Sequence, residues 1–243
     1  MPTQRRLRFM LRLAVVALLL SSAGPGTGWA EDWEARLLGS WVTTSADVLT
    51  ELDDGPGLYV GVERRLNERW GVELGLGWHQ LEGSVTERVE FFGLRFESRI
   101  GSEVEWLPVS IAGNFHLTPR SDFDVYVSAR AGQAFFQDVR ITSEASFATD
   151  LNGFPLPVLI TDPGPAVTLE FAADDSLFYG ARLGVDRSFG DGAWAFSATI
   201  DWTVLELEYD PLSALPPPFV DPVPDVQVDL DPVTIGIGVS RRW

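Results

Sequence analysis

Residues 70–78 read Trp70-Gly71-Val72-Glu73-Leu74-Gly75-Leu76-Gly77-Trp78, a strict alternation between large apolar residues and small or charged ones. A period of two predicts a β-strand with two different faces. An aromatic residue closes each end of the apolar face, and nine residues tilted near 40° rise by roughly 25 Å, the height of the apolar band of an outer-membrane barrel. Alone, this segment fits either a membrane-crossing strand or one strand of a soluble sandwich, so the rest of the chain has to decide.

The first thirty residues have the parts of a secretory signal peptide: a basic start, an apolar run from Leu13 to Leu20, and small residues before a cut after Ala30. We therefore expect a signal segment at 1–30 and a mature domain at 31–243. An apolar run of eight residues is too short to cross a bilayer as a helix, which takes about 20 residues, and no later segment approaches that length. The sequence therefore argues against a helical membrane protein.

The 243 residues include 35 acidic side chains, 18 basic ones that are all Arg, two His and no Cys. The absence of Cys excludes disulfides and thiolate metal sites. The formal charge is −17, and it falls to −21 without the signal segment, which holds four Arg and no acid. Such a balance argues against nucleic acid as a partner, because phosphate binding needs a basic surface. No cofactor and no metal site are predicted.

The alternating pattern recurs, which gives eight predicted strands in all. They cover approximately residues 33–42, 58–65, 70–78, 106–117, 123–132, 177–186, 194–202 and 233–240. Tight turns near residues 67, 120 and 191 alternate with long connections at about 44–55, 82–103, 137–175 and 209–231. Short periplasmic turns and long extracellular loops are typical of an outer-membrane barrel, in which a closed sheet leaves no unpaired edge. The predicted fold is all-β, an eight-stranded antiparallel transmembrane up-and-down β-barrel in the outer membrane of a Gram-negative bacterium.

A soluble lipocalin-like barrel also has eight alternating strands, so the orientation of the faces matters. The apolar faces carry Trp, Phe and many Leu, Ile and Val, which are too bulky for so narrow a lumen, whereas the other faces carry Gly, Ala, Ser and paired charges. We therefore expect lipid outside and a polar lumen inside. The expected lumen charges are Glu34, Arg36, Glu63, Arg65, Glu73, Asp124, Arg130, Arg182, Asp186 and Asp201. The expected aromatic girdle is Trp33, Trp41, Trp70, Trp78, Trp194 and Trp202.

Negative charge concentrates in the four long connections, which together hold 21 acidic residues against 4 Arg. These loops either gather cations that bridge to anionic lipid head groups or are merely polar and soluble. The segment around Pro216-Pro217-Pro218 predicts a stiff, extended arm that either projects outward for recognition or caps the barrel.

Apolar residues lie near the outer mouth of the predicted lumen, above the charges. They are Val42, Tyr59, Trp106, Phe136 and Phe178. Rings above a polar floor suit a site for a small hydrophobic molecule, although they also fit an aromatic plug that only completes packing. His79 and His116 fall at opposite ends of adjacent strands, roughly 25 Å apart, so they do not form one site. No catalytic residues are predicted.

Several segments resemble the OmpW-like outer-membrane proteins. Leu107-Pro108, Phe115-His116, Pro119 and the run Phe123 to Val127 are similar to the central hairpin of that family. Tyr179-Gly180, Gly184-Val185-Asp186 and the closing run Ile235 to Val239 are similar to its later strands. The resemblance implies an eight-stranded barrel with a narrow apolar upper channel, associated with passage of small hydrophobic compounds. It also implies that the terminal aromatic residue, here Trp243, is a signal for the barrel-assembly machinery. Arg241 departs from the pattern, since an aromatic or aliphatic residue is usual there, and so do the long acidic third and fourth loops.

Three hypotheses on function follow. The leading one is a passive channel or binding barrel for small hydrophobic molecules, with outer-membrane lipid as its surroundings. The second is a surface structural or adhesion barrel whose acidic loops act and whose lumen is closed. A third, a lipid-modifying enzyme, has little support, and we expect no enzyme.

Overall fold

The computed structural model describes residues 33–46, 48, 51–91, 94–119, 121–149, 166–190, 192–210 and 225–243. The predicted signal segment at 1–30 and the Pro-rich stretch around residue 217 lie outside this range. No helix in the described part is long and apolar enough to cross a membrane.

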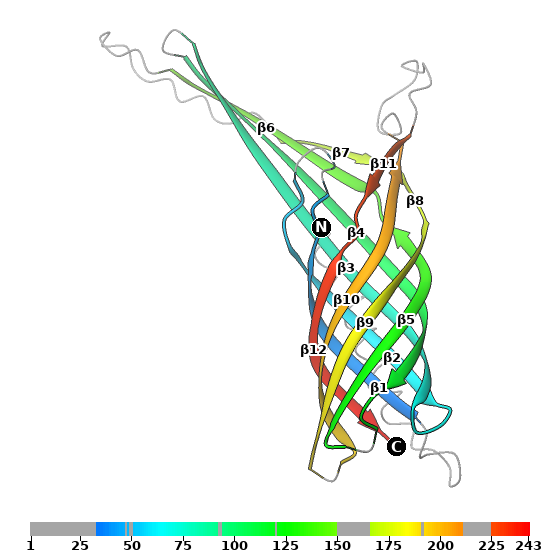
Figure 1. Ribbon diagram of the computed structural model, residues 1–243. Helices are drawn as coiled ribbons and strands as arrows, with labels where there is room; N and C mark the ends of the chain where they lie inside the picture. Colours follow the sequence, from blue (N-terminus) through cyan, green and yellow to red (C-terminus); the bar gives the residue numbers. More distant parts are fainter. Residues whose placement is uncertain are drawn as a thin grey trace.

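Antiparallel strands make up nearly all of the described chain (Figure 1). They are β1 (Trp33–Thr43), β2 (Gly55–Arg65), β3 (Trp70–Phe91), β4 (Leu94–His116), β5 (Phe123–Phe136), β6 (Val139–Thr149), β7 (Val167–Phe171), β8 (Ala173–Asp174), β9 (Ser176–Phe189), β10 (Trp194–Tyr209), β11 (Val226–Asp229) and β12 (Val233–Arg242).

Three walls of the barrel are built from consecutive strands in line. β6 continues β5, because β4 pairs first with β5 and then with β6. β7, β8 and β9 form the next wall, because β7 pairs with β6, β8 with β10, and β9 with both β5 and β10. β11 leads into β12 along β10. The break between β11 and β12 falls at Asp231, whose φ of 37° is positive and whose side chain accepts the Leu205 N–H at 3.1 Å. With β1, β2, β3, β4 and β10, these composite walls give eight.

The sheet closes on itself, since β3 pairs with β4 and β1 pairs with β12. A path that follows paired residues from strand to strand around the ring starts at Trp33 of β1 and returns to β1 at Thr43, ten residues further on. The path runs through Arg64, Val72, Gly113, Ala129, Ala181, Trp202 and Val233. Eight strands with this stagger tilt by about 40° and enclose a barrel of about 8 Å backbone radius. The ring confirms the predicted fold class.

The two faces of the wall differ as the alternation predicts. Outward apolar side chains are exposed, for example Leu74 (64%) and Ile237 (70%), whereas inward charged side chains such as Glu73 (0%) are buried. A soluble barrel would show the opposite pattern, so the exposed apolar face is a lipid-facing surface.

Aromatic residues border this apolar face at both ends. Trp33, Trp70 and Trp194 lie at the end with the short turns, and Trp41 and Trp202 lie at the other. Trp41 donates its indole N–H to Asp54 at 3.1 Å, just outside the span, and hydrogen bonds from Thr43 and Trp41 hold the pKa of the Asp54 carboxyl below its ordinary value. Trp78 differs from its predicted place in the lipid-facing girdle. It is buried and donates its indole N–H to Glu105 at 2.7 Å.

The long connections contain much more strand than expected. Residues 82–91 and 94–103, predicted as a polar loop, form the outer half of the β3–β4 hairpin, with Glu82 opposite Glu103 and Phe91 opposite Leu94. β6 and β7 occupy both ends of the 137–175 connection, and β11 occupies part of 209–231. Polar strands outside the membrane lack the apolar alternation that marks a lipid-facing strand, so their sequence resembles that of a loop. Figure 1 shows this sheet rising beyond the barrel.

Candidate functional site in the barrel interior

Glu73 of β3 is the centre of a buried ion network in the lumen. Arg182 Nη1 donates to Glu73 Oε1 at 2.7 Å, and Arg36 and the Tyr59 hydroxyl also donate to this carboxylate. Glu73 and Arg36 are at most 2% exposed. A carboxylate with three donors from β1, β2 and β9 ties together walls that are far apart in the sequence.

The network extends upward to Asp201 of β10. Arg182 Nε and Arg130 Nη1 both donate to Asp201 Oδ1, each at 2.7 Å. Arg182 therefore bridges two carboxylates, and its guanidinium also lies 4.4 Å from the centre of the Tyr59 ring. This side chain thus joins the part of the network around Asp201 to the part around Glu73, and together they form one layer.

A second layer closes the periplasmic end of the lumen. His116 Nε2 lies 2.8 Å from Glu63, and His116 Nδ1 lies 3.0 Å from Asp124. Arg65 donates to Asp124 at 2.7 Å and Arg242 donates to Glu34 at 2.7 Å. Since carboxylates are acceptors, an imidazole between two of them is best served when both ring nitrogens donate, as in the imidazolium form.

Glycines make room for the large side chains in this narrow interior. A Cβ on Gly184 would stand 2.1 Å from the Tyr126 ring, and one on Gly75 would stand 2.2 Å from the Tyr59 hydroxyl. Tyr126 is fully buried, with the Arg36 guanidinium 4.8 Å from its ring centre. The small residues of the inward face are therefore the space into which tyrosines and arginines pack.

Each residue predicted for the lumen is inward, and the structure brings the charged ones together in the two layers just described. The charged set is Glu34, Arg36, Glu63, Arg65, Glu73, Asp124, Arg130, Arg182, Asp186 and Asp201. Asp186 accepts from Arg36 at 3.0 Å. Sequence reasoning left out Arg242, which belongs to the floor, and gave His116 no partner. The pairing depends on register, and no local signal in the sequence reveals it.

Above the ions, apolar residues fill the outer half of the interior. Val42, Trp106 and Phe178 belong to one buried cluster, and Phe136 packs at its border with its ring centre 6.2 Å from that of Trp106. Tyr59 does not join them, because its hydroxyl binds Glu73 at mid-height. The remaining members of the cluster are Ala46, Leu52, Leu81, Val104, Ala134, Val139, Ile141, Phe171, Leu205, Leu207, Tyr209 and Leu230. Burial raises the pKa of Tyr209, which lies beyond the upper aromatic border.

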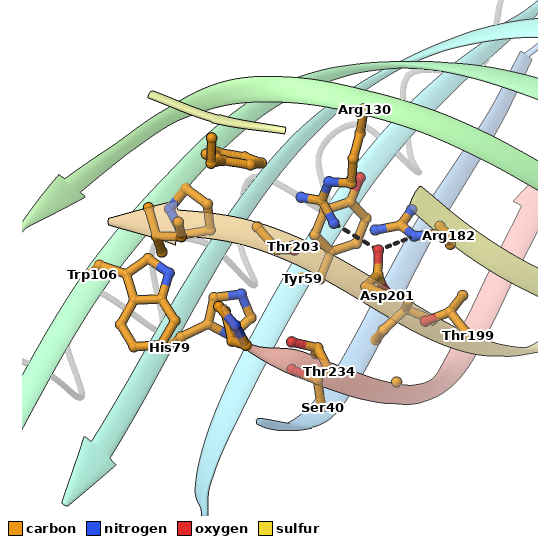
Figure 2. A pocket seen from close by; sticks show the side chains of 16 residues that line it. Ser40, Tyr59, His79, Trp106, Arg130, Arg182, Thr199, Asp201, Thr203 and Thr234 are labelled. Atoms are coloured by element: carbon orange, nitrogen blue, oxygen red, sulfur yellow. Dashed lines mark hydrogen bonds and ion pairs between the residues drawn. The ribbon is translucent and has the colours of Figure 1, made fainter. Parts of the chain in front are cut away.

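Between the cluster and the ions lies a cavity of about 30 Å³ (Figure 2). Trp106, His79 and Phe178 form its apolar side, and Ser40 and Thr199 belong to its polar side. The ring centres of His79 and Trp106 are 5.2 Å apart. A cavity needs roughly 10–15 Å³ to hold one water, so this space takes a few atoms at most.

Among the described residues, no group of three His, Cys, Asp or Glu side chains is placed to hold a metal ion. His79 and His116 lie at opposite ends of the lumen, one at the cavity and one at the floor, as the sequence predicts.

Comparison with solved structures finds similar barrels. The crystal structure of the outer membrane protein OprG from Pseudomonas aeruginosa matches 89% of this chain and 97% of its own at 16% identity, with a TM-score of 0.52. AlkL, solved by solid-state NMR in DMPC bilayers, matches 90% of this chain and 94% of its own at 13% identity, with a TM-score of 0.47. The crystal structure of Ail, the attachment invasion locus protein of Yersinia pestis, was solved in complex with the heparin analogue sucrose octasulfate. It matches 86% of this chain and 99% of its own at 14% identity, with a TM-score of 0.39.

No protein-family model matches the chain, and no curated protein matches it by sequence. The likeness to OprG concerns the fold. Together with the closed ring and the exposed apolar band, it identifies an OmpW-like outer-membrane β-barrel fold, in agreement with the resemblance noted in the sequence.

Proposed function

We propose that this outer-membrane barrel is a surface protein with a closed lumen that acts through its extracellular sheet. The observation that carries the proposal is the sealed interior. Ion pairs cross the lumen in two layers, and an apolar cluster fills the mouth above them. A solute that crosses the barrel would have to break ion pairs in both layers and displace the apolar cluster.

The energy of this seal supports the proposal. Breaking one buried ion pair by removing a partner costs about 3–5 kcal/mol, because a buried charge is left uncompensated. A permeating ion would have to disturb several such pairs, including those of Glu73 and Asp201. We therefore expect no measurable conductance for the native barrel.

The extracellular sheet supplies a stiff surface that reaches beyond the membrane. Arg88 pairs with Glu97 across the β3–β4 hairpin at 2.8 Å, and Arg140 pairs with Glu170 across β6 and β7 at 2.9 Å. An open groove of about 530 Å³ lies on this sheet and is bordered by Glu82 and Arg140. A polar groove on a hydrogen-bonded sheet suits contact with another surface better than storage of an apolar molecule.

Two measurements test the proposal together. Refolded protein in a planar bilayer should show no channel events, whereas Arg182→Ala, which removes the link between two carboxylates, should show occasional ones. Replacing residues 84–101 by an Asn-Gly turn shortens the hairpin to the pair Gly83 and Ser102 and should abolish attachment of cells that display the protein.

A charge swap, Arg88→Glu with Glu97→Arg, serves as the matched control, because the hairpin and its ion pair remain. Steady conductance of the native protein, or unchanged attachment after hairpin removal, would contradict the proposal.

The cavity favours a second candidate function, binding of a small hydrophobic molecule at the mouth. Trp106 and Phe178 offer apolar walls, and the cavity beneath them shows that packing there is incomplete. Trp106→Ala should enlarge the cavity and tighten binding of a small aromatic probe such as benzene, whereas Trp202→Ala on the lipid face should not. Equal binding by both variants would rule this candidate out. Neither candidate includes a chemical reaction.

Assembly is a further part of the proposal. Trp243 exchanges backbone hydrogen bonds with Trp33, donating at 3.1 Å and accepting at 3.4 Å, so the last residue helps to close the ring. We expect the barrel-assembly machinery to act on this terminal segment. Deleting Trp243 should slow insertion into membranes that contain the machinery more than insertion into pure lipid.

A further inference from the structure

We infer that the periplasmic end of the barrel binds anionic phospholipid through three outward arginines, each of which lies over one or two aromatic rings. Arg64 lies 5.7 Å from the ring centre of Trp33, and Arg187 lies 5.2 Å from that of Phe123. Arg241 lies between Trp194 at 5.4 Å and Trp243 at 5.9 Å. These arginines and the rings under them are here named the arginine belt, and they include Arg241, the unusual charged residue near the end of the chain.

The belt runs over six neighbouring strands, in the order β2, β1, β12, β10, β9 and β5. The register places Arg64 opposite Trp33, Arg241 opposite Trp194, and Arg187 opposite Phe123. All three therefore lie in one band at the end with the short turns, which faces the periplasm in outer-membrane barrels.

Charge complementarity indicates an anionic partner. Among the described residues, the outward strand positions of this band carry no acidic side chain, although the chain as a whole has a formal charge of −17. Glu68 and Asp122 lie in the turns beyond the strands. The remaining outward positions of the band on β5, β9, β10, β12, β1 and β2 are apolar: Val125, Val185, Phe189, Phe196, Val239, Ala35 and Val62. Positive charge above an apolar, lipid-facing wall fits a molecule with a phosphate above acyl chains.

The chemistry of stacked arginine fits a phosphate. A guanidinium that lies over a ring presents its N–H groups at its edge, where a phosphate accepts two parallel hydrogen bonds. Aromatic residues at a membrane border sit at the depth of the head groups. The phospholipid of the periplasmic leaflet is the partner that places its phosphate at this depth.

The opposite side of the barrel provides an internal contrast. At the same height, the outward side chains of β3 and β4 are Trp70, Val72 and Phe115, and the rings of Trp70 and Phe115 are 4.9 Å apart. Arg69 lies in the turn before β3 and not on a strand. An aromatic border thus exists without an arginine on its strands, so the arginines of the other side are not needed merely to complete it. Lipid selectivity should therefore be confined to one side.

Quenching of tryptophan by brominated lipid measures this selectivity, because Trp33, Trp194 and Trp243 lie in the belt. The refolded protein is placed in phosphatidylcholine vesicles, and phosphatidylglycerol with brominated chains is titrated against brominated phosphatidylcholine. An arginine near an anionic membrane surface contributes about fivefold in binding. We expect a preference for phosphatidylglycerol of about that size, weakened by added NaCl.

The combined variant Arg64→Gln, Arg187→Gln and Arg241→Gln should reduce the preference to about one, whereas Arg88→Gln on the extracellular hairpin should keep it. The matching Arg→Lys triple variant retains charge and should keep part of the preference, which also guards against a loss caused by misfolding. The inference fails if the native protein shows no preference, if the Gln variant keeps it, or if lipid A displaces phosphatidylglycerol from the belt.

Discussion

Replacing Arg182 by alanine should destabilise the barrel more than the loss of an exposed ion pair. Arg182 is 3% exposed and holds both Glu73 and Asp201 at 2.7 Å. Its loss leaves two buried carboxylates, but Glu73 keeps Arg36 and Asp201 keeps Arg130. Removal of a buried partner costs about 3–5 kcal/mol, and because the remaining arginines compensate in part, we expect the lower end, about 3 kcal/mol.

Urea unfolding of the protein in vesicles, followed by far-UV circular dichroism and by the shift in gel mobility on unfolding, measures this loss. Arg88→Ala is the matched control, since Arg88 forms an exposed pair with Glu97 and such pairs contribute at most about 1 kcal/mol. A second variant that combines Arg182→Met with Glu73→Gln removes one charge of each sign and should recover part of the stability. If Arg182→Ala unfolds within about 0.5 kcal/mol of the native protein, the ion network does not hold the walls together.

Three further changes test other parts of the structure. Gly184→Leu should place a side chain into the Tyr126 ring and lower the free energy of unfolding by about 1–3 kcal/mol or prevent folding, as a refolding yield would show. Ile237→Arg, at mid-height on the lipid face, should cost about 2–4 kcal/mol in the same urea titration, and a cost near zero would contradict the proposed orientation. Burial raises the pKa of Tyr209, so its contribution to stability is present below about pH 10 and is lost as the pH rises through the folded-state value. Between pH 9 and pH 12, the free energy of unfolding of Tyr209→Phe should therefore fall less than that of the native protein. Parallel curves of this free energy against pH would disprove the prediction.

Alternation was sufficient to predict the barrel and the direction of its faces. A lipid-facing strand has to be apolar at every second residue, so the pattern in residues 70–78 leaves one choice of face for Glu73 and Leu74. The same argument placed Arg36, Arg130 and Arg182 inside the lumen. These predictions depend only on the parity of a residue within its strand.

The height that a side chain reaches in the lumen and its hydrogen-bond partner could not be predicted in this way. Tyr59 lies on the inward face as expected, but its long side chain reaches Glu73 instead of the mouth. Trp78 has the parity of a lipid-facing residue, and its bond to Glu105 is formed across β3 and β4. Both outcomes depend on the stagger of neighbouring strands, which turns and bulges determine and local sequence does not.

The charges of the lumen add a final argument for a closed interior. The described inward charges are six carboxylates (Glu34, Glu63, Glu73, Asp124, Asp186 and Asp201) and five arginines (Arg36, Arg65, Arg130, Arg182 and Arg242). His116 donates to two of these carboxylates when both of its nitrogens are protonated, and this makes the set neutral. A channel that selects ions keeps an excess of one sign along its path. A neutral set in which each charge has a buried partner leaves no such excess, so an entering ion would break a pair without gaining a better one.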